Sequence, residues 1–305
     1  MRSEEALNDA ARLSVIVASY NSPATLEKCL ESLTGQLDSG AEVIVADAST
    51  EDPRPRLGSR FAGVQFLRFP GQLTIPELRR EALKIAKGEI ILLTEGRIVP
   101  SYGWAAALVE AHHTHPQAPA VGGPIDPTPT SPLDFAIYLC EYGRHMPPTG
   151  DGECEELSGA NLSYKRWVLD SCRDLIDAAA WEPFLHRRLE RQGYRLWRAG
   201  QALACYHNSL SIGQVLRQRF HYGRWFAASR VEKAGLPRRL FYFALSPLLP
   251  SVLIWRLGRI VFERRRFRML FVRALPWTAM FVSAWALGEF CGYLAGKGTS
   301  DRKVF

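Results

Sequence analysis

Short apolar runs alternate with amphipathic helix patterns along the first half of the chain. The runs at residues 13–20, 42–47 and 89–94 contain few polar side chains, which is typical of strands buried on both faces of a sheet. Ser22 and Pro23 follow the first run and have the residue types of a helix N-cap and of a first helical position. The alternation predicts an α/β fold, with a mostly parallel sheet flanked by helices.

The same two patterns continue further along the chain. Thr74 and Glu77 have the spacing of a capping box at the start of a helix. Residues 120–125 and 159–166 have strand patterns, the second leading into a helix, and residues 183–192 have a helix pattern. We therefore expect all of these segments to belong to one α/β domain.

The chain changes character after residue 232. Residues 240–255 are uncharged, but this run is only 16 residues long and is interrupted by Pro247 and Pro250. An interfacial or re-entrant hairpin is therefore expected there. Residues 274–296 carry one charge in 23 residues and are long enough to cross a bilayer as a helix. The alternative is that both runs are buried core helices of a soluble protein.

Three regions follow from these patterns. We expect a polar N-terminal tail at residues 1–11, an α/β domain at residues 12–232 and membrane-associated helices at residues 233–305. The tail has no apolar segment, so no signal peptide is expected. Residues 263–268 form a basic stretch between the two apolar runs, which the positive-inside rule places in the cytoplasm. The expected location is the inner membrane, with the α/β domain on its cytoplasmic face.

The net charge of +7 and the isoelectric point near 9.2 indicate an anionic partner: nucleic acid, a phosphate-bearing substrate or a membrane surface. The basic clusters after residue 186 border apolar runs, so membrane contact explains them better than nucleic-acid binding. Six scattered cysteines without a C-x-x-C pair argue against a zinc site and a disulfide scaffold. The histidines at residues 112–115 have no paired carboxylate, so no metal site is expected there.

Polar residues follow three of the predicted strands at the point where each strand ends. Tyr20 and Asn21 follow the first strand, and Asp47 ends the second. Glu95 and Arg97 follow the run that ends at residue 94. The carboxyl ends of parallel strands share one edge of the sheet, where open α/β sheets bind ligands. The loop after the first strand lacks the glycines of a dinucleotide-binding turn, which argues against a Rossmann dehydrogenase.

Six segments in a fixed order resemble the family 2 glycosyltransferases, which have the GT-A fold. They are VIVASYN, VIVADAST, RREALKIAKGEIILL, TEGRIVPSYGW, GANLSYKR and WEPFLHRRLERQGY. The resemblance covers roughly residues 12–230. The segments LDFAIYLCEYGRHMPP, RQRFHYGR and WALGEFCGYLAG also resemble a membrane-associated bacterial branch of that family. The resemblance implies an enzyme that takes a sugar from a nucleotide-sugar donor.

The resemblance also implies a set of nucleotide-sugar-binding residues. Tyr20 and Asn21 match the first nucleotide loop, where an aromatic ring lies against the base. Asp47 matches the acid that contacts the base or the ribose, and Arg79 matches an arginine that meets the diphosphate. The local alternatives are a simple turn at Tyr20 and Asn21, and capping of its own turn by Asp47. For Arg79 the alternative is a solvated helix face.

A second set of residues matches the acceptor side and the catalytic base. Gly159 and Asn161 match a G-x-N strand, where glycine permits a close approach and the amide binds sugar hydroxyls. Glu182 stands where the family carries its catalytic base, and Trp181 precedes it on the acceptor side. A carboxylate at that place would accept the proton of an acceptor hydroxyl. The alternatives are a plain turn at Gly159 and a first-turn glutamate favoured by the helix dipole at Glu182.

The metal-binding D-x-D motif of the family is degenerate in this chain. Glu95 and Arg97 occupy its place, so Glu95 is the single candidate ligand there for Mg²⁺ or Mn²⁺. We expect metal binding to be weakened or lost, with Arg97 and Arg79 neutralising the phosphates instead.

The expected reaction is an inverting transfer of a sugar from a nucleotide-sugar donor to a hydroxyl group of the acceptor. The expected acceptor is a lipid or a growing cell-surface polysaccharide, and the expected metal dependence is weak or nil. No nucleic-acid partner is expected. The alternative is a catalytically silent GT-A domain that binds a sugar nucleotide or a protein partner at the membrane.

Overall fold

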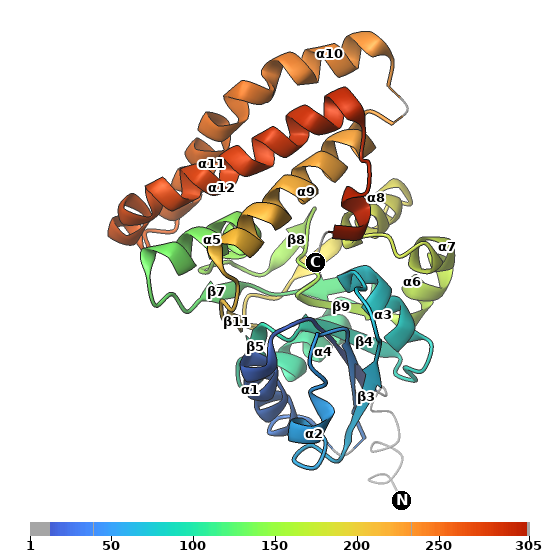
Figure 1. The fold of residues 1–305 in the computed structure, drawn as a ribbon. Coiled ribbons are helices and arrows are strands. Elements are labelled where there is room, and N and C mark those ends of the chain that lie inside the picture. The colour runs from blue at the N-terminus through green and yellow to red at the C-terminus, as the bar shows by residue number, and fades with distance from the viewer. Residues whose placement is uncertain (1–12, 39, 233, 304–305) are drawn as a thin grey trace, which may run out of the picture. The chain divides into compact units, whose positions relative to one another are not determined.

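The structure is a computed structural model that describes residues 13–303, with the exception of Ser39 and Lys233 (Figure 1). The predicted polar tail at residues 1–11, and with it the expectation of no signal peptide, falls outside the described residues.

The chain divides into two compact units, an α/β unit and a helical unit. The α/β unit comprises Met1–Asp126 and Pro147–Tyr206, and the helical unit comprises Pro127–Met146 and His207–Phe305. Two segments that the sequence assigns to the α/β domain therefore belong to the helical unit. The functional boundary predicted between residues 232 and 233 stays a prediction.

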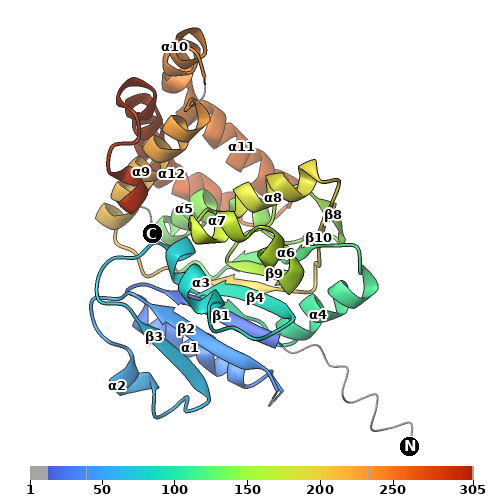
Figure 2. The ribbon, with the colours of Figure 1, turned by 90° about the vertical axis from the view of Figure 1, so that its right-hand side faces the viewer.

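An eight-stranded sheet forms the centre of the α/β unit (Figure 2). Its strand order is β3-β2-β1-β4-β9-β6-β10-β8. The strands are β1 (Leu13–Ser19), β2 (Glu42–Asp47), β3 (Val64–Arg68), β4 (Ile90–Glu95), β6 (Ala120–Gly122), β8 (Gly152–Cys154), β9 (Asn161–Lys165) and β10 (Leu196–Arg198). The three remaining described strands form a small sheet in the order β5-β11-β7: β5 (Ile98–Pro100), β11 (Ala204–Tyr206) and β7 (Ile125–Pro127).

The first four strands of the large sheet are parallel, as the alternation of strand and helix patterns predicts. β1 pairs in parallel with β2 and β4, and β2 pairs in parallel with β3. β9 runs antiparallel to β4 and to β6, so the complete sheet is mixed. The direction of β9 depends on the path of the preceding connection rather than on its own residues. The α/β architecture is confirmed.

Helices cover both faces of the large sheet (Figure 2). They are α1 (Pro23–Thr34), α2 (Arg54–Leu57), α3 (Ile75–Leu83), α4 (Trp104–Thr114), α6 (Arg166–Ser171), α7 (Arg173–Asp177) and α8 (Glu182–Arg191). Leu78 of α3 and Leu185 of α8 share a buried apolar cluster with Ile16 of β1. α3 and α8 therefore cover the same face of the sheet. The predicted capping box between Thr74 and Glu77 is present at the start of α3.

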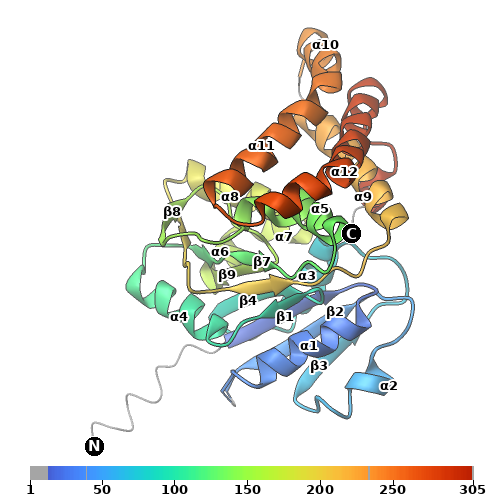
Figure 3. The ribbon, with the colours of Figure 1, turned by 90° about the vertical axis from the view of Figure 1, so that its left-hand side faces the viewer.

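The helical unit is built around one long helix. Its helices are α5 (Pro132–Tyr142), α9 (Ile212–Arg230), α10 (Leu236–Leu245), α11 (Leu249–Glu263) and α12 (Arg268–Ala295). α12 lies between α9 and the run formed by α10 and α11 (Figure 3). A Cβ atom at Gly288 of α12 would lie 2.1 Å from the carbonyl oxygen of Phe220 on α9. The two helices can approach this closely because the position has no side chain.

The first apolar run is one continuous helical segment. α10, a 3-10 turn at Ser246–Leu248 and α11 follow one another directly, and Leu236–Glu263 is 28 residues long. The predicted hairpin is therefore wrong. Pro247 and Pro250 are the second residues of their helical segments, within the first turn, where a missing N–H removes no hydrogen bond of that segment. By length and composition, Leu236–Glu263 and Arg268–Ala295 could each cross a membrane.

His112 is a buried histidine of the α/β unit. Its Nε2 lies 2.9 Å from Oγ of Ser163 on β9, and only 2% of the residue is exposed. Burial lowers the pKa of His112 from 6.5 to about 3, and the charges of Lys165 and His113 act in the same direction. The folded chain therefore keeps this imidazole neutral at pH values where the unfolded chain protonates it.

We expect this histidine to make folding sensitive to mild acid. Above pH 6.5 His112 is neutral in both states, and as the pH falls from 6.5 towards 3 only the unfolded chain gains the proton. The free energy of unfolding should therefore fall by about 2 kcal/mol between pH 7 and pH 4.5 through this group. His112→Gln should remove that part of the slope in urea unfolding followed by tryptophan fluorescence. His113→Gln, at the exposed neighbour, is the control, and equal slopes for both variants would contradict the prediction.

Candidate active site

Three strand ends meet at one edge of the large sheet. Ser19 at the end of β1 pairs with Asp47 at the end of β2, and Ala18 pairs with Glu95 at the end of β4. The loops that follow these strands are therefore neighbours, as expected for the carboxyl ends of parallel strands. This edge carries the residues that the sequence analysis assigns to the nucleotide-sugar site.

Arg79 lies at the centre of a buried ionic cluster at this edge. Its Nη2 donates hydrogen bonds to Oε1 of Glu95 and to the carbonyl oxygen of Gly159, both at 2.9 Å. Its Nη1 pairs with Oε1 of Glu182. The exposed fractions are 4% for Arg79, 8% for Glu182 and 9% for Glu95. The structure thus brings together four residues that the sequence assigns to separate parts of the site.

Gly159 is in contact with this cluster through its backbone. A Cβ atom there would lie 2.6 Å from the carboxyl carbon of Glu182 and 2.7 Å from Nη1 of Arg79. Any side chain at this position would have to displace one of the two ionic partners, because a real Cβ atom does not approach heavy atoms so closely. The close approach at Gly159 is therefore made to the protein's own ionic pair.

Glu182 is the first residue of α8, and Trp181 is the residue that precedes the helix. Trp181 is partly buried and packs against the apolar cluster under α3 and α8. The carboxylate of Glu182 thus lies at the positive end of the helix dipole and beside a guanidinium group. Both features place positive charge beside this carboxylate.

Tyr164 and His186 are two buried residues near the cluster that the sequence analysis does not single out. Oη of Tyr164 lies 2.9 Å from Nε2 of His186. Burial raises the pKa of Tyr164 well above its usual value, and the negative charge of Glu182 adds to the rise. The phenol is therefore neutral at physiological pH. His186 follows Glu182 by four residues on α8, and this one-turn spacing is the signal that would have identified it.

A small pocket opens beside the ionic cluster, next to α3, α7 and α8. Arg79, Tyr164 and Glu182 line it, together with apolar residues such as Pro76 and Leu185. A ligand group entering this space would meet two cationic side chains, Arg79 and Arg80, one anionic side chain and the Tyr164 phenol within an otherwise apolar wall. Pockets with a few convergent polar groups of this kind are typical of small-molecule sites.

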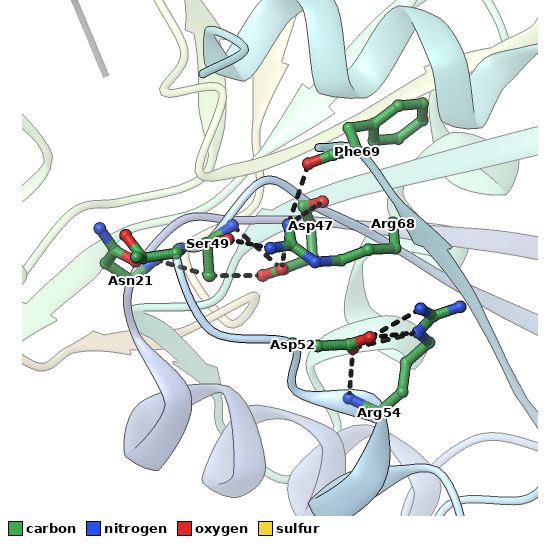
Figure 4. Close-up of polar contacts among 8 residues, drawn as sticks. Asn21, Asp47, Ser49, Asp52, Arg54, Arg68 and Phe69 are labelled. Carbon is green, nitrogen blue, oxygen red and sulfur yellow. Dashed lines mark hydrogen bonds and ion pairs between the residues drawn. The ribbon is translucent and has the colours of Figure 1, made fainter. Parts of the chain in front are cut away.

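Asp47 is held by its own turn and by Arg68 (Figure 4). Its carboxylate accepts hydrogen bonds from N of Ser49 at 3.0 Å and from Oγ of Ser49 at 2.7 Å. Nη1 of Arg68 lies 3.3 Å from Oδ1 of Asp47. Asn21 joins the two loops, donating from N to Oγ of Ser49 at 2.7 Å and accepting from N of Thr50 at 2.8 Å. Asp47 thus caps its own turn, and its contact with a base or ribose stays a prediction.

Arg68 is a residue of this edge that the sequence analysis misses. It ends β3 and stands directly opposite Asp47 in the pairing of β2 with β3. Its pairing with Asp47 depends on the register of β3 with β2, which no local pattern of residues shows.

Tyr20 and Arg97 belong to the loops that follow β1 and β4. Tyr20 is partly buried and packs against the apolar cluster that covers this face of the sheet. Arg97 lies in the turn between β4 and β5, with 9% of the residue exposed. A Cβ atom at Gly96 would lie 2.7 Å from Oγ of Ser22. The turn that carries Arg97 therefore approaches the loop after β1 closely.

Asn161 is engaged by the protein through every polar atom of its side chain. Its Nδ2 donates to the carbonyl oxygens of Pro124 and Ala202 at 2.8 Å, and its Oδ1 accepts from Nε1 of Trp104 at 2.7 Å. The residue is fully buried. A sugar hydroxyl could bind this amide only by replacing one of these bonds, so its role in acceptor binding stays a prediction.

Comparisons with known proteins agree with this architecture. Residues 14–136 match the model of glycosyl transferase family 2. A mannosyltransferase, PcManGT from Pyrobaculum calidifontis, solved with GDP-Man and Mn2+, has a TM-score of 0.53 and 18% identity, covering 96% of this chain and 85% of that one. GalNAc-T7, solved with UDP, GalNAc and Mn2+, has a TM-score of 0.54 and 14% identity, covering 74% of this chain and 52% of that one. A search of curated proteins found no match.

The identities to these solved structures are low, so the likeness concerns the fold. The large sheet and the helices on both of its faces are those of the GT-A fold. The match of residues 14–136 assigns that part of the chain to glycosyl transferase family 2.

We expect Gly159→Ala to disrupt the ionic cluster. The added methyl group would separate Arg79 from Glu182 and destabilise the α/β unit by about 2 kcal/mol. If the cluster is catalytic, the displacement should also lower turnover by about 100-fold. Thermal unfolding and release of nucleoside diphosphate would measure the two effects. Gly150→Ala is the control, because a Cβ atom there meets nothing within 4 Å, and equal behaviour of the two variants would contradict the prediction.

Proposed function

We propose that the enzyme transfers a sugar with inversion from a nucleotide-sugar donor to a hydroxyl group of a lipid or cell-surface glycan. The observation that carries this proposal is the buried contact between Arg79 and Glu182 beside an open pocket. In this proposal Glu182 is the carboxylate that accepts the proton, and it lies next to a cationic group at the edge where open α/β sheets bind ligands. Two similar structures hold GDP-Man or UDP, which supports a nucleotide-sugar donor for this chain.

Arg79 has two competing tasks in the proposed reaction. Without a donor it neutralises Glu182 and Glu95. A bound diphosphate is a stronger attraction, because a guanidinium group can bind phosphate oxygens through two parallel hydrogen bonds. Transfer of one or both Nη groups of Arg79 to the diphosphate would release the carboxylate of Glu182 for an acceptor hydroxyl.

The chemical step then follows from these positions. Glu182 accepts the proton of the acceptor hydroxyl, and the oxygen attacks the anomeric carbon from the face opposite the diphosphate. The bond between that carbon and the β-phosphate oxygen breaks, and the nucleoside diphosphate leaves with the bonding electrons. Arg79 and Arg97 stabilise the negative charge that develops on the leaving group. One displacement inverts the anomeric configuration.

The residues at the D-x-D position do not fit a divalent cation well. Glu95 is the single carboxylate of this turn, and it is paired with Arg79 at 2.9 Å. Arg97 follows two residues later and adds a second positive charge. Mg²⁺ and Mn²⁺ favour several carboxylate or other oxygen ligands without adjacent cations. The proposed reaction therefore uses no metal ion. The alternative is metal-assisted transfer, which the Mn2+ bound in two similar structures favours.

Glu182→Gln should abolish most of the transfer, and thermal unfolding should show how far the loss of its ion pair with Arg79 destabilises the α/β unit. Removal of a general base lowers the rate by about 100- to 10,000-fold. Release of nucleoside diphosphate from a panel of sugar nucleotides would be measured together with donor binding. Glu190→Gln is the matched control, because Glu190 is an exposed residue of the same helix.

The same experiment tests the alternative of a catalytically silent domain. A silent domain would bind a sugar nucleotide and release no nucleoside diphosphate, with or without Glu182. An active wild type whose turnover survives Glu182→Gln would instead remove Glu182 from the catalytic role.

Turnover should persist in the presence of a chelator. If Arg97 and Arg79 provide the charge at the phosphates, EDTA should change the rate by no more than about twofold, and Arg97→Gln should lower it by about 10- to 100-fold. Loss of activity in EDTA that Mn²⁺ fully restores would contradict this assignment.

A further inference from the structure

The first apolar run of the helical unit contacts α12 on one side and leaves many of its large side chains exposed. Only 6% of the most apolar window of Leu236–Glu263 is buried, and the chain leaves large side chains such as Leu240, Phe241, Leu248 and Trp255 exposed. A contiguous apolar surface of this kind is typical of contact with lipid or with another protein.

α12 extends this surface along one stripe. Its exposed large apolar residues are Met269, Val272, Leu287 and Leu294. At about 100° per residue, these four positions fall within about 60° of one another around the helix. The other faces of α12 are covered by α9, by α5 and by the α10–α11 run. The helix therefore presents a narrow apolar stripe on an otherwise protein-packed body.

The helices that cover α12 are charged. α9 carries Arg217, Arg219, His221, Arg224 and Arg230. α9 is also bound tightly to α12, because a Cβ atom at Gly292 would lie 2.4 Å from the carbonyl oxygen of Arg224. If α12 crossed a bilayer along its length, α9 would enter the hydrocarbon with these side chains, at a high cost for each charge.

The uncharged part of the first run is also short for a span. Residues 240–255 rise by about 24 Å as a helix, compared with about 30 Å for the hydrocarbon core of a bilayer. Arg256 and Arg259 follow directly on α11. Although Leu236–Glu263 is helical throughout, its uncharged part is still only residues 240–255.

The end of α11, the turn at residues 264–267 and the start of α12 are strongly basic. Together these residues, 256–273, contain seven arginines and one acid, Glu263. If both runs crossed the membrane, this turn would lie on the opposite side from the chain that precedes residue 236. If the α/β unit binds a donor in the cytoplasm, these seven arginines would then lie on the non-cytoplasmic side of the membrane. That location is contrary to the positive-inside rule.

We propose that the helical unit lies in the plane of one membrane leaflet and does not cross it. The exposed apolar side chains of α10, α11 and α12 enter the outer part of that leaflet, and the arginines of residues 256–273 bind the phosphates of anionic lipids. Their long stems reach along the apolar surface while the guanidinium groups stay at headgroup level. Arg259 lies along this apolar surface, with its guanidinium carbon 5.9 Å from the ring centre of Trp255. This inference deepens the membrane context of the proposed function.

The side of the membrane on which the turn lies provides the first test. Arg265→Cys and Thr299→Cys place single new thiols in the turn and after α12, both at exposed positions. The reagent is a membrane-impermeant maleimide-polyethylene glycol, applied to sealed membrane vesicles. Each variant should gain one adduct more than the parent protein, and both variants should be modified from the same side of the membrane. Modification from opposite sides would show that the helices cross and would overturn the proposal.

Binding to vesicles provides the second test, in the absence of any sugar donor. The full chain should bind phosphatidylcholine vesicles more tightly when they contain phosphatidylglycerol. Simultaneous Arg264→Gln, Arg265→Gln and Arg266→Gln should weaken binding to the anionic vesicles by about 100-fold. The matched control has the same change in charge on the α/β unit, with Arg173→Gln, Arg191→Gln and Arg195→Gln at exposed positions.

Two results would overturn the lipid assignment. The first is equal binding of both triple variants to anionic vesicles. The second is a detergent-free dimer that ignores vesicles, which would mean that a second copy covers the apolar surface. Neither readout involves catalysis, so failure of this proposal is distinguishable from failure of the glycosyl-transfer proposal.

Discussion

The α/β unit depends on one buried guanidinium group that neutralises two carboxylates. Arg79 of α3 contacts Glu95 at the end of β4, Glu182 at the start of α8 and the backbone of Gly159 before β9. Removing one partner of a buried ion pair costs about 3–5 kcal/mol, because the other charge is left without compensation. The relative positions of these four elements are therefore fixed by the same contacts that make up the candidate site. Catalytic geometry and local stability cannot be varied independently here.

Strong local patterns made much of the α/β unit predictable. β1, β2 and β4 are uninterrupted apolar runs, and the capping box at Thr74 fixes the start of α3. The resemblance to a family located Arg79, Glu95 and Glu182, but their mutual pairing depends on the packing of α3 against α8, which no local pattern encodes. The ion pair between Asp47 and Arg68 was missed for the same reason, since it depends on strand register.

The helical unit was harder to predict, for a different physical reason. A proline breaks a helix only when it falls inside one, and the sequence does not show where a helical segment begins. Pro247 and Pro250 stand at segment starts, so the run that they interrupt in sequence is continuous in space. Glycines within a helix are also difficult to interpret from sequence alone. Gly288 is a poor helix former in isolation, yet α12 needs it where α9 passes.

If the loops around Asp47 bind the donor as proposed, their hydrogen bonds affect its selection. Asn21, Ser49, Thr50 and Arg68 hold the two loops in one arrangement through contacts within the protein. A loop that is ordered beforehand loses little conformational entropy when it binds, so weak contacts there contribute more fully to affinity. The same rigidity limits adaptation, because a base of different shape cannot reorganise the loop without breaking several hydrogen bonds. The choice between nucleotides would then depend on the loop conformation of the folded protein rather than on a rearrangement of the loops upon binding.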